Sequence, residues 1–279
     1  MREISSGTII AAVRNLCIEA NMRLPGDVEN AIASARRSEQ WEPALESLDL
    51  LKKNLEIAAE RQLPICQDTG AACVFVELGT DVHISGDFNA AINQGVREGY
   101  EQGFLRKSIA SDPLRRGNTG DNTPAFITVE LVNGDGMKIT VAPKGFGSEN
   151  MSALKMLNPS DGIDGVMDFV LETVKNAGPN PCPPVILGVG IGGTFDKVAC
   201  LAKKALLRPL DVTNGDPFYA DMERGLLERI NTLGIGPQGF GGKTTCLGVA
   251  IETLPTHVAG LPVAVNISCH ATRRASIVL

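Results

Sequence analysis

The apolar residues of this chain change their spacing near residue 63, and that change limits the folds open to it. Before this point they recur at helical intervals, as in Ile9, Val13 and Leu16 and again in Leu48 and Leu55. Beyond it, short runs of β-branched and other apolar residues alternate with further helical segments, which is typical of strands and helices in one fold. The sequence therefore predicts an α/β fold, in which an N-terminal helical region is followed by a mixed β-sheet surrounded by helices.

Individual elements follow from the same patterns. Strands are expected at residues 72–78, 125–132, 137–142, 247–254 and 262–268. Helices are expected from Asp87 to Gly103, from Ile163 to Ala177 and from Pro217 to Gly234. Residues 133–136, "NGDG", have the residue types of a tight turn, so the strands on either side are predicted to form a hairpin.

The domain organisation is predicted from continuity and length. After residue 62 the sequence shows no internal repeat, low-complexity tract or obvious linker. A chain of 279 residues can bury a sizeable core. We therefore predict a single domain over residues 1–279, with a helical prelude at 1–62 and a mixed α/β core at 63–279.

Composition excludes several classes of partner. The net charge is −6 and no Lys/Arg-rich stripe is present, which argues against nucleic acid and anionic membranes. The N-terminus lacks the pattern of a signal peptide, and no apolar run approaches the roughly 20 residues of a membrane span. The seven cysteines are odd in number and irregularly spaced, unlike a secreted disulfide framework. A cytoplasmic protein is expected.

Two glycine-rich segments suggest nucleotide binding as an alternative. Residues 188–193, "GVGIGG", fit the dinucleotide pattern G-x-G-x-x-G between a strand and a helix, but Asp211 downstream does not end a convincing second strand. The segment "GGKTT" imitates the end of a P-loop, yet Pro237 stands where its first glycine belongs. A tight strand-to-helix turn and an amide-rich loop with one cation are the favoured interpretations, and a nucleotide-binding enzyme stays open as the alternative.

The cysteines divide by their surroundings. Cys17, Cys73 and Cys200 lie inside apolar helical or strand patterns and are predicted to be core residues, while Cys246 is ambiguous. The other three lie where an apolar segment meets a polar or proline-containing loop, which makes them candidate metal ligands: Cys66, Cys182 and Cys269. They are far apart in the sequence, so the fold must assemble any site they share. The residues alone leave unrelated loop thiols, a zinc site or a noncatalytic scaffold as alternatives.

Six segments in this order resemble a known family: "PICQDTG", "KGFGSEN", "NPCPP", "GVGIGGT", "GIGPQGFGGKT" and "SCHATRR". They cover essentially the whole chain, and they resemble the class I fumarase and tartrate dehydratase family of iron-sulfur hydro-lyases. The match is to the part that forms the alpha subunit in two-subunit members. The resemblance implies that Cys66, Cys182 and Cys269 hold a 4Fe-4S cluster. One iron without a protein thiolate would then act as a Lewis acid towards substrate.

The resemblance also implies roles for the residues after Cys66. Asp68 matches a residue that transfers a proton to or from the substrate hydroxyl, and Gln67 and Thr69 would hydrogen-bond the substrate or orient Asp68. For an isolated match, "QDTG" would be interpreted as an ordinary Asx turn closed by glycine.

Further implied site residues lie elsewhere in the chain. Arg106 resembles the arginine that binds a substrate carboxylate, and Gly147 resembles a glycine whose backbone approaches the substrate. His257 matches a histidine beside the catalytic aspartate. The roles of His270 and Arg273 are left undecided by the sequence.

The family resemblance predicts a partner and a reaction. The chain ends shortly after Cys269, so a separate beta subunit is expected to complete the active site, in a dimer of heterodimers. The small dicarboxylate pair fumarate and (S)-malate is the expected substrate, interconverted by reversible hydration. L-tartrate dehydration is the alternative.

Overall fold

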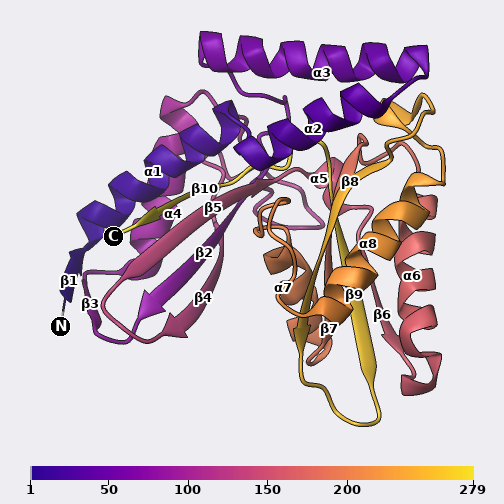
Figure 1. The fold of residues 1–279 in the computed structure, drawn as a ribbon. Helices are drawn as coiled ribbons and strands as arrows, with labels where there is room; N and C mark the ends of the chain where they lie inside the picture. Colours follow the sequence, from indigo (N-terminus) through magenta and orange to yellow (C-terminus); the bar gives the residue numbers. More distant parts are fainter. Residues whose placement is uncertain (1) are drawn as a thin grey trace. The chain divides into compact units, whose positions relative to one another are not determined.

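The structure is a computed structural model that describes residues 2–279. The chain forms two compact units. The first unit contains the residues up to Pro25, Leu55–Phe146 and Arg273–Leu279; the second contains Gly26–Asn54 and Gly147–Thr272. Each unit has a four-stranded mixed sheet, and the predicted α/β fold is confirmed (Figure 1). No helix in residues 2–279 is long and apolar enough to cross a lipid bilayer.

The first unit is built on a sheet with the strand order β10-β5-β2-β4. Its elements are β1 (Arg2–Ser5), α1 (Ser6–Met22), β2 (Ala71–Gly79), β3 (Val82–Ser85), α4 (Phe88–Gln102), β4 (Phe126–Val132), β5 (Met137–Lys144) and β10 (Ala275–Val278). A separate parallel pair joins β1 and β3. Two helices, α3 (Glu42–Arg61) and α5 (Phe146–Glu149), contribute residues to both units.

Close packing of α1 against α4 forms the core of the first unit. The N-cap Ser5 accepts a hydrogen bond from the Thr8 amide at the start of α1. A Cβ added at Gly95 would lie 2.7 Å from the Val13 Cβ, so the backbone of α4 meets α1 only because glycine stands there. The apolar face of α1, with Ile9 and Val13 fully buried, also packs on β5 and β10.

The predicted hairpin at "NGDG" is wrong. Strand β2 lies between β4 and β5, parallel to the first and antiparallel to the second. The segment 133–136 instead passes the end of β2, where the Gly79 amide donates to the Gly136 carbonyl and the Asp81 amide to the Gly134 carbonyl, both at 2.9 Å. These residue types do make a turn here, but the turn goes around a third strand.

The second unit has the strand order β6-β9-β7-β8. Its elements are α2 (Gly26–Ser38), β6 (Ala153–Leu157), η1 (Pro159–Asp161), α6 (Gly162–Ala177), β7 (Val185–Gly192), α7 (Phe195–Ala205), α8 (Pro217–Asn231), η2 (Pro237–Gly239), β8 (Cys246–Leu254) and β9 (Leu261–Ser268). Helix α7 packs on β7 and β9, and α6 and α8 pack on the sheet through a larger apolar cluster (Figure 1). Helix α8 begins at Pro217, as predicted, and Asp216 caps it by accepting from the Phe218 amide.

Helix packing explains the glycines of "GVGIGG". Gly188 and Gly190 lie within β7, and an added Cβ would come within 2.0 Å of the Ala202 carbonyl oxygen and 2.3 Å of the Val198 carbonyl oxygen. Both glycines are therefore needed so that α7 can approach the sheet. The nucleotide interpretation needs the first glycines in a turn that cradles phosphate, whereas here they are strand residues covered by a helix.

The cysteine predictions are partly confirmed. Cys17 and Cys73 are buried, and Cys246 is also buried at the start of β8. Burial raises the pKa of the Cys17 and Cys246 thiols to about 12. The prediction for Cys200 is wrong, because this residue is exposed. Helix α7 buries a stripe formed by Val198, Ala202 and Ala205, and Cys200 lies off that stripe.

Candidate active site

The loop before β2 carries the first candidate ligand, Cys66. The Ile65 amide donates to the Asn21 carbonyl of α1 at 2.9 Å, and the buried Ile65 side chain anchors the beginning of the loop. Cys66 itself is half-buried, and the Asp68 amide lies 3.4 Å from its Sγ. Amide hydrogen bonds to sulfur are among the contacts that tune thiolates bound to iron-sulfur clusters. The exposed Gln67 places its Oε1 3.5 Å from the same sulfur.

Asp68 is fixed by four hydrogen bonds. Its Oδ1 accepts from the Gly70 amide at 3.0 Å, which is the Asx turn expected of "QDTG", and its Oδ2 accepts from the Phe146 amide at 2.9 Å. Its own amide donates to Cys66 Sγ, and its carbonyl accepts from Arg273 Nη2. The carboxylate is half-buried, so it is both oriented and accessible. The Asx turn and a catalytic role are thus compatible, since the turn aims the carboxylate.

The Thr69 side chain binds the backbone of Arg106 in this structure. The Thr69 side chain is buried, and its hydroxyl accepts from the Arg106 amide at 2.9 Å and donates to the Arg106 carbonyl at 3.2 Å. The Arg106 side chain remains exposed. Both hydrogen-bonding functions of the hydroxyl are occupied, so Thr69 positions the backbone of Arg106 beside the Asp68 loop.

Two further residues that the sequence analysis did not identify support this loop. The hydroxyl of the fully buried Tyr100 lies 2.9 Å from both the Thr69 and Gly70 carbonyl oxygens. The buried Asn122 donates to the Gly70 carbonyl at 3.2 Å. Tyr100 fits the apolar stripe of α4, and no sequence signal connects its hydroxyl with a loop so distant in the chain.

Replacing Gly70 by alanine is expected to destabilise the first unit strongly. Gly70 has φ +76°, and an added Cβ would lie 2.7–2.8 Å from backbone atoms of Lys144. Gly120 has a similar φ of +81° with open space around it. Replacing Gly120 by alanine therefore measures the cost of the positive φ alone, without a steric clash. We expect Gly120→Ala to cost about 1–2 kcal/mol and Gly70→Ala more than about 3 kcal/mol, measured by urea unfolding of the apoprotein. Equal losses would show that the approach to Lys144 contributes nothing.

The second unit brings Cys182 and Cys269 to the same edge of its sheet. Strands β7 and β9 are antiparallel neighbours with Ile186 opposite Ser268, so the residues before β7 and after β9 meet. His270 connects the two loops, because its Nδ1 lies 3.0 Å from the Cys182 carbonyl oxygen. The Gln238 amide nitrogen lies 3.2 Å from the same ring nitrogen. Cys182 is exposed and Cys269 half-buried, so both thiols lie in accessible loops.

The other two candidates of the second unit lie in different surroundings. His257 is exposed in the loop between β8 and β9, where its Nδ1 accepts from the Ala259 amide at 3.1 Å. This loop precedes β9 whereas Cys269 follows it, so the length of the strand, about 26 Å, separates the two residues. Gly147 is exposed, and nothing lies within 4 Å of a Cβ built on it. The space beside its backbone is open.

The donor set suits an iron-sulfur cluster in its chemistry. None of the seven cysteines in residues 2–279 forms a disulfide, and the three candidate ligands all lie in accessible loops. Cys66 belongs to the first unit, and Cys182 and Cys269 to the second. Within the described chain, no group of three or more His, Cys, Asp or Glu side chains is arranged to hold a metal ion. The structure thus brings two of the three thiol-bearing loops together and holds the third beside Asp68.

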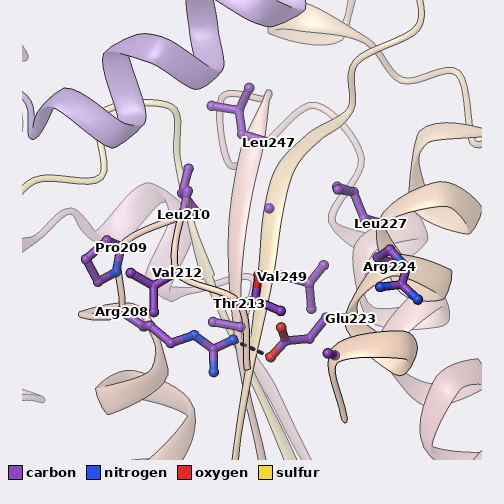
Figure 2. Close-up of a pocket in the computed structure, with 13 residues that line it drawn as sticks. Arg208, Pro209, Leu210, Val212, Thr213, Glu223, Arg224, Leu227, Leu247 and Val249 are labelled. Carbon is purple, nitrogen blue, oxygen red and sulfur yellow. Dashed lines mark hydrogen bonds and ion pairs between the residues drawn. The ribbon is translucent and has the colours of Figure 1, made fainter. Parts of the chain in front are cut away.

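A separate cavity of about 200 Å³ lies in the second unit between the loop 208–213, α8 and β8 (Figure 2). Arg208 and Glu223 form an ion pair across it. Glu223 also accepts from the Ile251 amide at 2.7 Å and from Asn214 at 3.1 Å. No cysteine or histidine lines the cavity, and its charged groups at the base are already paired. These contacts hold α8 and the loop against β8.

Comparison with known proteins gives a consistent result. Residues 10–278 match the family model described as fumarate hydratase (fumerase). A Methanocaldococcus jannaschii protein named "Putative L(+)-tartrate dehydratase subunit alpha" is 46% identical over 265 residues, which is 92% of each chain. An L(+)-tartrate dehydratase subunit alpha of Escherichia coli strain UTI89 is 34% identical over 95% of this chain and 88% of its own. The protein of the same name in strain K12 is 32% identical over 96% and 89%.

Proposed function

The chain belongs to the fumarate hydratase family of hydro-lyases, and on this premise we propose that it is the alpha subunit of an iron-sulfur fumarate hydratase. The proposed enzyme interconverts fumarate and (S)-malate together with a beta subunit, in a reducing cytoplasm. The observation that carries the proposal is the loop in which one backbone turn holds the Cys66 thiol and the Asp68 carboxylate together. A metal ligand and a proton-transferring group are two of the components that a metal-assisted hydration of a double bond uses.

In this proposal Cys66, Cys182 and Cys269 hold a 4Fe-4S cluster. When bound, the cluster supplies a Lewis-acidic iron for the substrate oxygen. The accessibility of all three cysteines supports the assignment, as does the contact between the loops of Cys182 and Cys269 through His270. The buried Cys17, Cys73 and Cys246 are unsuited, because ligation requires a thiol that the cluster can reach.

The remaining roles are performed by the side chains around the loop. Asp68 moves the proton of the substrate hydroxyl, and its two backbone hydrogen bonds hold the carboxylate in one orientation. Arg106 binds a substrate carboxylate through its exposed guanidinium, and Thr69 sets its backbone position. The exposed Gln67 contacts substrate beside Cys66, and the open backbone of Gly147 donates its amide. His257 lies at the opposite end of β9 from Cys269, and we assign it no step within this chain.

Dehydration of L-tartrate is the second candidate reaction. The relatives named L(+)-tartrate dehydratase subunit alpha favour it, whereas the family description favours fumarate. The "KGFGSEN" and "GGKT" segments resemble the fumarase versions more than the tartrate dehydratase versions. The two substrate pairs differ by one hydroxyl. A site without a partner for that hydroxyl would reject tartrate by about 1–3 kcal/mol, which corresponds to roughly 5- to 150-fold in kcat/KM.

Anaerobic co-expression of the chain with its beta subunit tests the substrate assignment. We expect reversible hydration of fumarate, with kcat/KM for L-tartrate dehydration lower by about 5- to 150-fold. The alpha chain alone is expected to bind iron and to show negligible turnover, because the proposed beta subunit completes the substrate site. Equal or faster reaction of L-tartrate would replace fumarate by tartrate in the proposal. Full activity of the isolated alpha chain would remove the beta subunit from it.

A further inference from the structure

Arg273 is a buried cation with unused hydrogen-bond donors. Its side chain belongs to the first unit and only 4% of the residue is exposed. Nη2 donates to the Asp68 carbonyl, whereas Nε and Nη1 are buried and have no hydrogen-bond partner within residues 2–279. Burying guanidinium N–H groups without acceptors is costly, so a folded protein rarely keeps such an arrangement unless something else binds there.

The one hydrogen bond that Arg273 makes in the described part of the chain is to a neutral group. Its electrostatic influence reaches Tyr100, whose pKa is raised well above its ordinary value mainly by burial. Tyr100 therefore stays neutral and supplies no negative charge. The acceptor that Arg273 does use, the Asp68 carbonyl, is also neutral. A buried guanidinium is normally paired with an anion, and its remaining donors are available for one here.

The position of Arg273 in the chain indicates which anion would pair with its guanidinium. The Asp68 carbonyl that it binds belongs to the residue whose amide contacts Cys66 Sγ at 3.4 Å. On its other side Arg273 follows Cys269 after three intervening residues, and Thr272 donates to the Cys269 carbonyl at 2.8 Å. Arg273 is thus linked to Cys66 through its hydrogen bond to Asp68, and to Cys269 through three intervening residues of the chain.

We propose that Arg273 is the buried counter-charge of the iron-sulfur cluster, and that its two unpaired donors, Nε and Nη1, would offset the negative charge of the bound cluster. This inference rests on the proposed function, because it requires the cluster to be bound by Cys66 and Cys269. A nearby positive charge stabilises the reduced form of a cluster more than its oxidised form, since reduction adds an electron. Arg273 therefore raises the reduction potential and at the same time holds the Asp68 backbone.

The test uses the complete alpha–beta complex, assembled anaerobically, with Arg273→Gln, Arg273→Met and Arg273→Lys. Cluster potential is measured by dithionite titration followed by electron paramagnetic resonance, together with iron content and KM. For Gln and Met we expect a more negative potential, by at least about 59 mV, the one-electron equivalent of a tenfold change in equilibrium constant. Lys, which keeps the charge, is expected to restore most of the shift. Methionine fills the space of the buried aliphatic part of Arg273 and adds no unsatisfied polar group. Arg273→Met therefore replaces Arg273→Gln in the test if the Gln variant does not fold.

Arg224→Gln is the control, because Arg224 is an exposed arginine of α8 paired with Asp221. Its potential is expected to equal that of the unchanged complex. Unchanged potential and iron content in Arg273→Gln and Arg273→Met would overturn the proposal. If those variants instead raised only KM, the anion would be a substrate carboxylate, which also overturns it. An unchanged complex that binds no iron would refute the proposed function itself, whatever the Arg273 variants do.

Discussion

Replacing Cys66, Cys182 or Cys269 by serine is expected to prevent cluster assembly, each substitution alone reducing iron to the level of the apoprotein. Serine is nearly the same size as cysteine but does not supply the thiolate that iron-sulfur clusters require. All three residues lie in accessible loops, so the fold of each unit should tolerate the change. Iron and acid-labile sulfide per chain, with visible absorbance under nitrogen, measure the outcome.

Cys200→Ser provides the matched control for this experiment. Cys200 is exposed on α7 in the same unit as Cys182 and Cys269, yet it lies outside the candidate site. Its variant should retain the iron content of the unchanged chain. Cys17 and Cys73 are poorer controls, because a change in a buried residue alters core packing as well as thiol chemistry. Full iron in any one of the three ligand variants would refute the ligand assignment.

The class of fold was predictable because hydrophobic period is a local property. Helix α8 begins at Pro217 after the cap Asp216, and both signals are contained in neighbouring residues. Strand order is different. The sequence predicts a hairpin of β4 and β5 because the segment that connects them has the residue types of a turn. Only long-range pairing places β2 between the two strands. A turn signal shows where the chain bends but does not exclude a third strand between the two ends.

Whether a single residue is buried or exposed could be predicted only where the apolar residues around it define one face of the helix or strand. Cys200 stands between apolar neighbours in sequence, yet α7 buries the stripe through Val198 and Ala202 and leaves Cys200 outside it. The glycines of "GVGIGG" gave a similar ambiguity. A close helix–strand contact and a phosphate loop both need residues without a Cβ, and only the structure shows α7 against Gly188.

In the candidate site, too, contacts between neighbouring residues could be predicted from the sequence, whereas contacts between distant residues could not. The Asx turn of Asp68 depends on four adjacent residues, so it can be predicted from the sequence alone. The internal role of Thr69 depends on Arg106, and the support of this loop by Tyr100 and Asn122 depends on residues far away in the chain. A buried arginine with unused donors has no sequence signature at all, so the sequence does not predict a role for Arg273.

Asp68→Asn is expected to reduce kcat by about 10²- to 10⁴-fold while the complex retains its cluster, because an amide cannot exchange the proton that a carboxylate transfers. The substitution also affects the loop. Oδ1 and Oδ2 each accept from a backbone amide, of Gly70 and of Phe146, so either orientation of an asparagine places its NH₂ group against one of these donors. One hydrogen bond to a charged acceptor is then lost, at about 1–3 kcal/mol in the unfolding free energy.

Separate measurements distinguish the two effects of Asp68→Asn. Urea unfolding of the apoprotein measures the contribution of the loop to stability, and iron content measures whether the cluster is bound. The value of kcat with saturating fumarate measures the effect on proton transfer. Asp221→Asn removes an exposed carboxylate of α8 and should change none of them beyond a few tenths of a kcal/mol. Asp68→Ala leaves both amide donors without an acceptor, so it should be less stable than Asp68→Asn but equally inactive. If kcat instead followed stability across these variants, with Asp68→Asn nearly active, Asp68 would be a structural turn residue and the proton would be transferred by another group.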